Sequence, residues 1–330
     1  MKPTNFAMLL SQYLLSYLPA QRGLQDNTIA SYEASFTRLI TYCTEEKGLP
    51  LQKITIEKLT PDFIVEYLDW LETERGNSPS TRNQRLSAIK AFFCFVQKEC
   101  PRYILNCQQI AQIPGKKCGS QPLSYLSHDE IKEMLAKPNQ FSDKGFRDLV
   151  IMSLLYDSGA RVSELINLSV RDIRLGKYAS VTLTGKGNKT REVPLSGDVA
   201  NLVKSYIIRS HLDGIEQQTA YLFQNTHGSP FTRAGITYIL QKYAPANHKK
   251  ITPHILRHTK AMHLLQSGVN IYYIRTILGH VDIKTTEIYA RADTEMKRKA
   301  LEKAYPVPVP ELEPWQDNHN LMDWLRMLSR

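Results

Sequence analysis

Cysteine is scarce in this 330-residue chain, and no two cysteines stand at the C-x-x-C spacing of zinc sites and redox motifs. The five cysteines are Cys43, Cys94, Cys100, Cys107 and Cys118. Their odd number and irregular spacing indicate neither a disulfide framework nor a zinc site, which is typical of proteins in a reducing compartment. We therefore expect a cytoplasmic protein.

The sequence also lacks a hydrophobic run long enough to cross a membrane. Lys2 and the apolar segment Phe6–Leu18 have a faint likeness to a secretory signal peptide. Polar residues interrupt this segment, however, and its apolar residues recur at the three- and four-residue spacing of a helix. The segment is therefore interpreted as an amphipathic helix, and no membrane partner is expected.

Motifs of the common zinc-dependent and nucleotide-dependent enzymes are absent as well. The chain contains no H-E-x-x-H and no G-x-G-x-x-G sequence. The pair Gly185-Lys186 does not complete a phosphate-binding P-loop, because Ser180 stands where the first glycine belongs and Gly187 follows the lysine. These absences argue against ATP-driven chemistry, and neither a cofactor nor a metal ion is expected.

Positive charge is in excess, with 42 Lys and Arg against 32 Asp and Glu and a formal net charge of +10. The first 110 residues are nearly balanced, with 12 basic against 11 acidic residues, whereas the rest of the chain holds 30 against 21. A basic excess favours a polyanionic partner, nucleic acid before an acidic membrane surface, although many basic proteins have neither. If the chain binds a polyanion, its C-terminal two-thirds should supply most of the attractive electrostatic field.

The first domain is expected over residues 1–107 and is predicted to be all-helical. Thr60-Pro61 begins one of its helices, and Ser80 is expected to cap another. Residues 108–121 are basic, contain Pro114-Gly115, and are expected to form a linker.

The second domain is expected over residues 122–310 and combines helices with a small β structure. Ser127–Glu130 is a capping box that opens a helix. The segments Ala179–Thr184 and Arg191–Leu195 predict short strands joined by a turn-rich loop, and helical periodicity resumes beyond them. The predicted fold class is therefore mainly α with a small antiparallel β hairpin or sheet.

A short tail over residues 311–330 follows the alternating prolines of Pro306–Pro310. Its apolar residues stand at i, i+3, i+4 and i+7, the spacing of an amphipathic helix. They are Leu321, Trp324, Leu325 and Leu328. This stripe needs a surface to pack against, either on its own domain or on another protomer.

Five short motifs of the second domain carry polar residues of chemical interest. In chain order they contain Arg161, Lys186, the pair His254 and Arg257 on one helix face, His280 after Leu278-Gly279, and Tyr289. Each motif is weak by itself, because an arginine at a helix start usually pairs with a surface carboxylate and a single tyrosine usually lies in a core or an interface.

The order and spacing of these motifs resemble those of the tyrosine recombinase (phage-integrase-like) family, especially its compact Xer-type members. The resemblance covers nearly the whole chain, because Thr28–Phe36 and Ser80–Phe95 are similar to the family's helical core-binding domain, which has a SAM-like fold. It implies that residues 122–310 form an α+β catalytic domain. The active-site residues that it implies are Arg161, Lys186, His254, Arg257, His280 and Tyr289.

The chemistry of DNA strand transfer suits these residue types. Two guanidiniums, those of Arg161 and Arg257, would bind the non-bridging phosphate oxygens in planar, bidentate hydrogen bonds. The hydroxyl of Tyr289 would be the nucleophile, but with an ordinary pKa of about 10 it needs a base. His254 and His280 are candidates for accepting its proton and for binding a phosphoryl oxygen.

Lys186, on its glycine-flanked loop, would then protonate the 5′ oxygen that leaves. The product would be a 3′-phosphotyrosyl bond and a free 5′-hydroxyl. Because this step conserves the bond energy, a second 5′-hydroxyl can reverse it without ATP, which fits the missing P-loop.

Further basic residues are interpreted as contacts to double-stranded DNA, although each could be an ordinary solvated side chain. They are Arg82, Arg85, Lys90, Lys116, Lys117, Lys189 and Arg191. Glu164 is expected to orient Arg161, with a plain surface glutamate as the alternative, and His258 is interpreted as a packing residue.

The predicted function is site-specific DNA recombination, in integration, excision, transposition or resolution, by a homotetramer on two DNA sites with the tail helix docked in trans. A nicking-closing enzyme of the type IB topoisomerase kind is one alternative, against which the compact first domain and the tail argue. A non-catalytic DNA-binding regulator on the same fold is another, against which the complete set of six residues argues. The tail favours a mobile-element enzyme.

Overall fold

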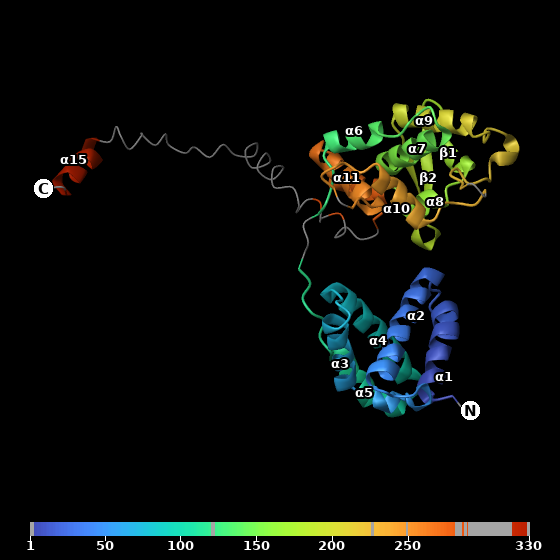
Figure 1. Cartoon of the computed structure of the whole chain (residues 1–330), viewed down its shortest axis with the longest axis vertical. Coiled ribbons are helices and arrows are strands. Elements are labelled where there is room, and N and C mark those ends of the chain that lie inside the picture. Colours follow the sequence, from blue (N-terminus) through green and yellow to red (C-terminus); the bar gives the residue numbers. More distant parts are fainter. Residues whose placement is uncertain are drawn as a thin grey trace. The chain divides into compact units, whose positions relative to one another are not determined.

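The computed structural model describes residues 3–119, 123–225, 228–248, 250–280, 286, 289 and 319–328, without the side chains of Lys186 and of residues 319–322. By its internal contacts the chain divides into two compact units, Met1–Gln121 and Pro122–Arg330. Figure 1 labels many of the elements of both units. In the described residues no helix has the length and apolar character needed to cross a membrane.

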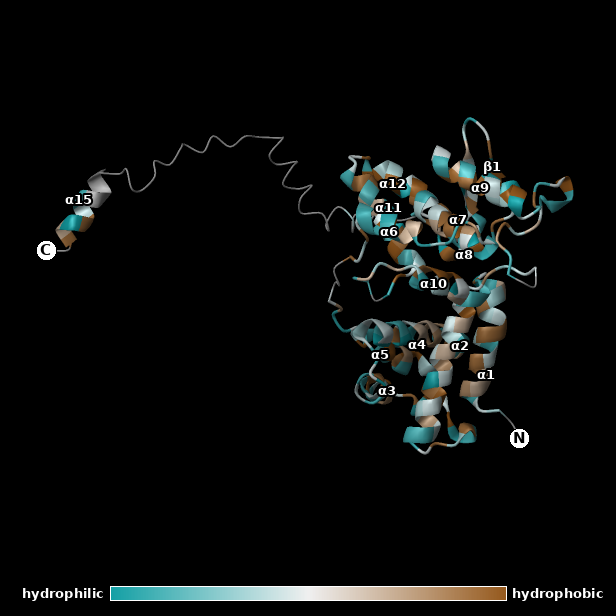
Figure 2. Ribbon diagram, turned by 45° about the horizontal axis from the view of Figure 1, so that its top comes forward, coloured by the Kyte–Doolittle hydropathy of each residue, from teal (hydrophilic) through white to brown (hydrophobic). Residues whose placement is uncertain are grey.

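The first unit is helical, and its helices bury one face each. They are α1 (Asn5–Gln12), a π-helical continuation (Tyr13–Gln21), α2 (Asp26–Thr41), α3 (Pro61–Thr73), α4 (Pro79–Glu99) and α5 (Ile104–Gln112). Figure 2 shows hydrophobic and hydrophilic residues along the same helix in α2, as one-sided burial requires. Aromatic rings of Tyr13, Phe36 and Phe92 meet in the core. The amphipathic helix expected near the N-terminus is confirmed, since α1 and its continuation bury Phe6, Leu9 and Tyr13.

Helix α4 begins two residues earlier than expected. The hydroxyl of Ser78 accepts a hydrogen bond from the backbone N–H of Thr81 at 3.3 Å, and Pro79 occupies the first helical position. A proline is favoured there because its missing N–H would have no partner in the helix and its φ is already helical. The prediction that Ser80 caps this helix is therefore wrong, because Ser78-Pro79 is the stronger start signal.

The segment expected as a linker, 108–121, is helical at its beginning. Helix α5 continues to Gln112, and both Ile110 and Ile113 are buried in the first unit. The backbone of Lys116 is also held, because its carbonyl accepts from Nδ2 of Asn83 at 2.7 Å and its N–H donates to Oδ1 at 2.9 Å. Apolar residues three apart continue the helical pattern up to Pro114, which explains why the first unit includes this stretch.

The second unit places helices around a small antiparallel sheet. Its helices are α6 (His128–Ala136), α7 (Asp143–Ser158), α8 (Val162–Ile166), α9 (Gly197–Arg209), α10 (Arg233–Lys242), α11 (Pro253–Gln266) and α12 (Ile271–Leu278). The strands are β1 (Ile173–Arg174), β2 (Ser180–Thr184) and β3 (Thr190–Pro194), in the order β1-β2-β3. The expected hairpin is β2–β3, and β1 adds a third strand. The fold class predicted from the sequence is confirmed.

Helix α7 lies at the centre of the second unit's core. Its residues Val150, Ile151 and Leu154 are almost fully buried, together with Val181 and Leu183 of β2. The capping box at the start of α6 is confirmed, since Ser127 and Glu130 bind each other's backbone N–H.

A glycine ends α7 where α12 approaches most closely. Gly159 has φ +58°, and a Cβ at this position would lie 2.8 Å from Cδ2 of Leu278. Only glycine adopts this left-handed conformation at little cost and leaves the space for Leu278. The next residues of the chain, Ala160 and Arg161, therefore lie beside the end of α12.

The tail contains a further helix, α15 (His319–Leu328), in agreement with the helical spacing of its sequence. The side chains of Trp324, Leu325 and Leu328 are exposed.

Candidate active site

Glu164 holds Arg161 from two sides. The backbone N–H of Arg161 donates to Oε2 of Glu164 at 2.7 Å, and Nη1 of Arg161 donates to Oε1 at 2.8 Å. The carboxylate is buried, so it is not the surface glutamate that the sequence left open as an alternative. Nη2 of Arg161 donates to the carbonyl of Gly279 at 3.0 Å, which directs the guanidinium toward the end of α12.

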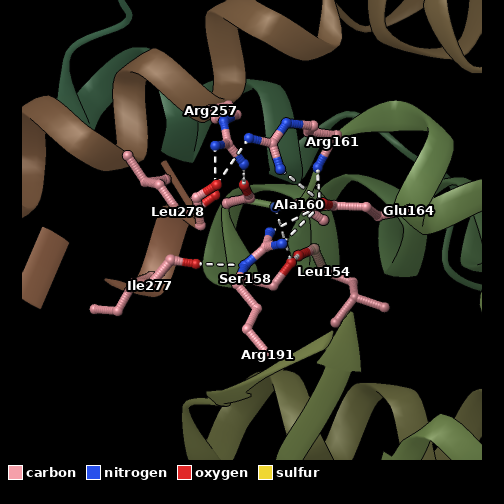
Figure 3. A network of polar contacts seen from close by, with 11 residues as sticks. Leu154, Ser158, Ala160, Arg161, Glu164, Arg191, Arg257, Ile277 and Leu278 are labelled. Carbon is pink, nitrogen blue, oxygen red and sulfur yellow. Dashed lines mark hydrogen bonds and ion pairs between the residues drawn. The ribbon is translucent and has the colours of Figure 1, made fainter. Parts of the chain in front are cut away.

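Arg191 of β3 binds the same carboxylate. Its Nη1 and Nη2 donate to Oε1 and Oε2 of Glu164 at 2.8 and 2.7 Å, and its Nε donates to the carbonyl of Ile277 at 2.8 Å (Figure 3). Only 11% of the side chain is exposed. The expectation that Arg191 contacts a DNA phosphate therefore does not hold, because its guanidinium is turned inward onto protein acceptors.

Arg257 lies on the first turns of α11, which Thr252 caps and Pro253 opens. Its Nη1 donates to the carbonyl of Gly159 at 2.7 Å, and its Nη2 donates to the carbonyl of Leu278. The guanidiniums of Arg161 and Arg257 thus bind the carbonyls of two successive residues, as Figure 3 shows for Leu278. His254 is three residues ahead of Arg257 and is exposed.

The site has an excess of positive charge. Burial alone would raise the pKa of Glu164, but the hydrogen bonds from Arg191 and Arg161 outweigh burial and hold the pKa at about 2. Burial, with the nearby charge of Arg161, lowers the pKa of Arg257 to about 10, so this guanidinium stays charged at neutral pH. Two guanidiniums, those of Arg161 and Arg191, therefore bind one carboxylate, and the third, that of Arg257, binds backbone carbonyls. The net positive charge suits the binding of a further anion.

His280 follows the left-handed Gly279 that ends α12. Its Nδ1 lies 3.0 Å from Oγ1 of Thr286. Burial, with the charges of Arg257 and Arg161, lowers the pKa of His280 to about 4. The ring is therefore neutral at neutral pH and able to accept a proton.

Tyr289 is 2% exposed, and its ring lies nearly parallel to that of His280, with 6.3 Å between the ring centroids. Burial raises the pKa of its hydroxyl, and the charges of Arg257 and Arg161 offset part of that rise. The predicted nucleophile therefore lies within the field of both arginines, as a protonated phenol.

The hydroxyl of Tyr289 is 2.9 Å from Nδ1 of His258. The ring of His258 also packs against that of Tyr289, with 5.6 Å between the ring centroids, so His258 has a polar contact in addition to the packing role expected for it. The sequence contained one indication that His258 lies near the site, because it follows His254 by four residues and therefore shares its helix face. Burial, with the proximity of His254 and the charge of Arg257, lowers the pKa of His258, so this ring too is neutral at neutral pH.

The turn between β2 and β3 carries Lys186, whose side chain is outside the described residues. The N–H of Gly185 donates to the carbonyl of Lys189 at 2.8 Å, which closes the turn. Gly187 and Asn188 have φ of +74° and +56°, a conformation that these two residue types accept most readily. Lys189 is exposed, as a DNA contact requires.

The basic residues predicted to contact DNA from the first unit differ in position. Arg82 is 4% exposed and forms an ion pair with Glu72 at 3.3 Å, so it is not available to DNA. It precedes Leu86 by four residues and therefore lies on the buried face of α4. Arg85 and Lys90 are half-buried, and Nη1 of Arg85 donates to the hydroxyl of Ser35.

The two lysines of the expected linker also differ. Both are exposed, but Lys116 forms an ion pair with Glu72 of α3. Of this pair, Lys117 is the better placed for a phosphate.

Comparisons with known proteins agree with the motifs. The model of the phage integrase family matches residues 124–296, and that of the phage integrase N-terminal SAM-like domain matches residues 10–99. The tyrosine recombinase XerD of Staphylococcus saprophyticus is 33% identical over 303 residues, which is 90% of this chain and 98% of the relative. XerD of Listeria monocytogenes is 30% identical over 300 residues, with the same coverage.

Solved structures share the fold. The Tn1549 transposon integrase in complex with transposon right end DNA has a TM-score of 0.67 at 19% identity, covering 89% of this chain and 98% of that one. The XerH site-specific recombinase bound to palindromic difH substrate has a TM-score of 0.66 at 20% identity, covering 85% of this chain and 81% of that one.

Proposed function

The chain belongs to the phage integrase family and is a tyrosine site-specific recombinase, and we propose that Tyr289 is its nucleophile in a site completed by five further side chains. These are Arg161, Lys186, His254, Arg257 and His280. One observation carries the proposal: the guanidiniums of Arg161 and Arg257 bind the carbonyls of Gly279 and Leu278, the two residues directly before His280. The positive charges of these two arginines also act on the hydroxyl of Tyr289.

Arg161 and Arg257 would bind the scissile phosphate of double-stranded DNA. Their planar donor pairs match two non-bridging oxygens, and they stabilise the charge that gathers there in the transition state. Both groups are positioned before DNA arrives, Arg161 by Glu164 and Arg257 by backbone carbonyls. Little reorganisation is then needed at the moment of reaction.

The nucleophile must become accessible before it can react. The hydroxyl of Tyr289 is buried and bound to His258, so attack on phosphorus requires that DNA binding or assembly move it toward the arginines. Neutral His280 or the exposed His254 would take the phenol proton, or bind a phosphoryl oxygen. Lys186, on its turn, would give a proton to the leaving 5′ oxygen.

This sequence of steps forms one bond from Tyr289 to the 3′ phosphate and breaks one bond to the 5′ oxygen. The energy of the phosphodiester is kept in the phosphotyrosyl bond. A 5′-hydroxyl from a second duplex can therefore close the break in the reverse reaction.

The assembly that we propose is a homotetramer on two DNA sites, because exchange of strands between two duplexes engages four cleavage sites. The first unit would act as the core-binding domain, with Arg85, Lys90 and Lys117 as DNA contacts, and the second unit would add Lys189. The exposed apolar side chains of α15 support docking of the tail on a neighbouring protomer.

Cleavage of a nicked suicide duplex tests the nucleophile. The duplex carries a site that the parent protein selects from a random DNA library, so that the piece released after cleavage diffuses away and the covalent complex accumulates. We expect the parent to form this complex and Tyr289→Phe to form none, with equal DNA binding by both. A covalent complex formed by Tyr289→Phe, or none formed by the parent, would refute the assignment.

A further inference from the structure

Arg191 is placed at a junction of the site. It is the second residue of β3, directly after the turn that carries Lys186, and it lies opposite Leu183 of β2. Its guanidinium uses three separate N–H groups on two acceptors, the Glu164 carboxylate and the Ile277 carbonyl (Figure 3). The guanidinium is thus bound through Nε as well as through Nη1 and Nη2, and little of the side chain is exposed.

Both acceptors belong to segments that carry proposed catalytic residues. The carboxylate of Glu164 also binds the backbone and the guanidinium of Arg161. Ile277 lies in the last turn of α12, three residues before His280. One side chain therefore joins the Lys186 turn, the start of α8 and the end of α12.

Gly279 gives independent evidence that the end of α12 is shaped around this arginine. Its φ is +64°, and a Cβ there would lie 3.0 Å from both Cδ and Nη1 of Arg191. A side chain at position 279 would therefore push against Arg191 as well as strain the backbone. The carbonyl of Gly279, in turn, accepts from Arg161.

We propose that Arg191 is a positioning residue for strand cleavage, which holds the Lys186 turn, Arg161 and the His280 segment in one arrangement without touching DNA. The proposal rests on the function proposed above. Arginine suits this place because its planar fork binds both carboxylate oxygens while Nε points to a third acceptor. Lysine would keep the charge, but its ammonium has no such fork.

The experiment compares Arg191→Lys and Arg191→Ala with Arg174→Ala, a matched control. Arg174 is an exposed residue of β1 in the same sheet, and its substitution removes the same charge. Two quantities are measured on the nicked duplex: the dissociation constant over a range of salt concentrations, and the rate of covalent complex formation at saturating protein.

We expect Arg191→Lys to lower the cleavage rate about 10- to 100-fold, because a displacement of about 1 Å in a reacting group has effects of that size. Arg191→Ala should lose at least as much. Both should keep the parent's affinity and its dependence on salt, and Arg174→Ala should keep the parent's rate. Because Arg191→Lys keeps the buried charge, it provides the test even if Arg191→Ala proves too unstable to purify.

A contact to a DNA phosphate would give the opposite pattern. It would weaken binding, lower the slope of log affinity against log salt by about 1, and leave the rate at saturation unchanged. That pattern, or a parental rate in both Arg191 variants, overturns the proposal. These outcomes differ from a failure of the proposed function, in which the parent itself forms no covalent complex.

Combining Arg191→Ala with Glu164→Gln tests whether the two residues act as one unit. We expect the double variant to be no slower than the slower single variant, since either change breaks the same arrangement. Losses that multiply would instead show independent roles and contradict the proposal.

Discussion

At the scale of single residues, the hydroxyl of Tyr289 has two incompatible requirements. As the proposed nucleophile, it must be protected while no DNA is bound, and it must reach phosphorus during the reaction. The hydrogen bond to His258 meets the first requirement, because a buried hydroxyl without a partner would cost about 1–3 kcal/mol. In the proposed reaction, the hydroxyl first exchanges this partner for the arginine-bound phosphate.

A double-mutant cycle measures this bond. His258→Phe should destabilise the protein by about 1–3 kcal/mol in urea unfolding, since it leaves the Tyr289 hydroxyl unsatisfied. Tyr289→Phe in the His258→Phe background should restore part of that loss, with a coupling free energy of about 1 kcal/mol.

His254→Phe is the control for this cycle, because His254 is exposed on the same face of α11. Its coupling to Tyr289→Phe should be close to zero. Equal coupling in the two cycles would mean that the His258 hydrogen bond contributes nothing specific.

At the scale of elements, the site depends on how tightly the ends of α7 and α12 pack. Gly159 lets Leu278 approach, and the carbonyls at this contact bind Arg257. A small displacement of either helix end would therefore move a guanidinium. Gly159 is thus required for the packing that positions Arg257.

Gly159→Ala should be more harmful than the same substitution at Gly268. Both glycines have positive φ, but a Cβ at Gly159 would lie 2.8 Å from Leu278, whereas a Cβ at Gly268 meets nothing within 4 Å. We expect Gly268→Ala to cost about 1 kcal/mol of unfolding free energy and Gly159→Ala about 2–4 kcal/mol, because a steric term of about 1–3 kcal/mol is added to the backbone term. Similar losses in urea unfolding would show that the contact with Leu278 relaxes freely.

The elements that the sequence predicted correctly are those whose sequence patterns lie within a few neighbouring residues. The capping box at Ser127–Glu130 and the β2–β3 hairpin each depend on residues a few positions apart. The two-residue strand β1 was missed because it is too short to show an alternating pattern.

The contacts that the sequence did not predict join distant segments. Arg191 and Ile277 are 86 positions apart, and His258 and Tyr289 are 31 apart. No periodicity or spacing reveals such a pair before the fold brings it together. The sequence therefore predicts a DNA contact for Arg191 and packing alone for His258, and it does not reveal their hydrogen bonds to Glu164, Ile277 and Tyr289.

At the scale of the whole molecule, we propose that different parts of the chain carry the catalytic chemistry and the assembly. The proposed site lies in Arg161–Tyr289, and the exposed apolar residues of the tail lie beyond it. Trp324 and Leu328 would be costly to leave in water in a protein that acted alone. The proposed assembly on DNA would give these side chains a partner.

Deletion of residues 311–330 should therefore separate binding from assembly. We expect the shortened protein to bind a single site with nearly the parent's affinity, measured by gel shift, and to form few complexes that hold two duplexes. Trp324→Ala in the full chain should weaken assembly in the same direction. Equal loss of single-site binding and of two-duplex complexes would contradict docking in trans.

The hydrogen bonds between Asn83 and the backbone of Lys116 have a consequence for conformational entropy. Fixing the backbone of one residue costs about 1–2 kcal/mol, and a connection that is ordered only on binding subtracts that amount from the affinity for each residue. Because α5, Ile113 and Lys116 are held against the first unit before any ligand arrives, this part of the connection loses no further freedom when both units engage one duplex. If both units engage one duplex as proposed, folding of the first unit would thus bear part of the ordering cost of binding DNA.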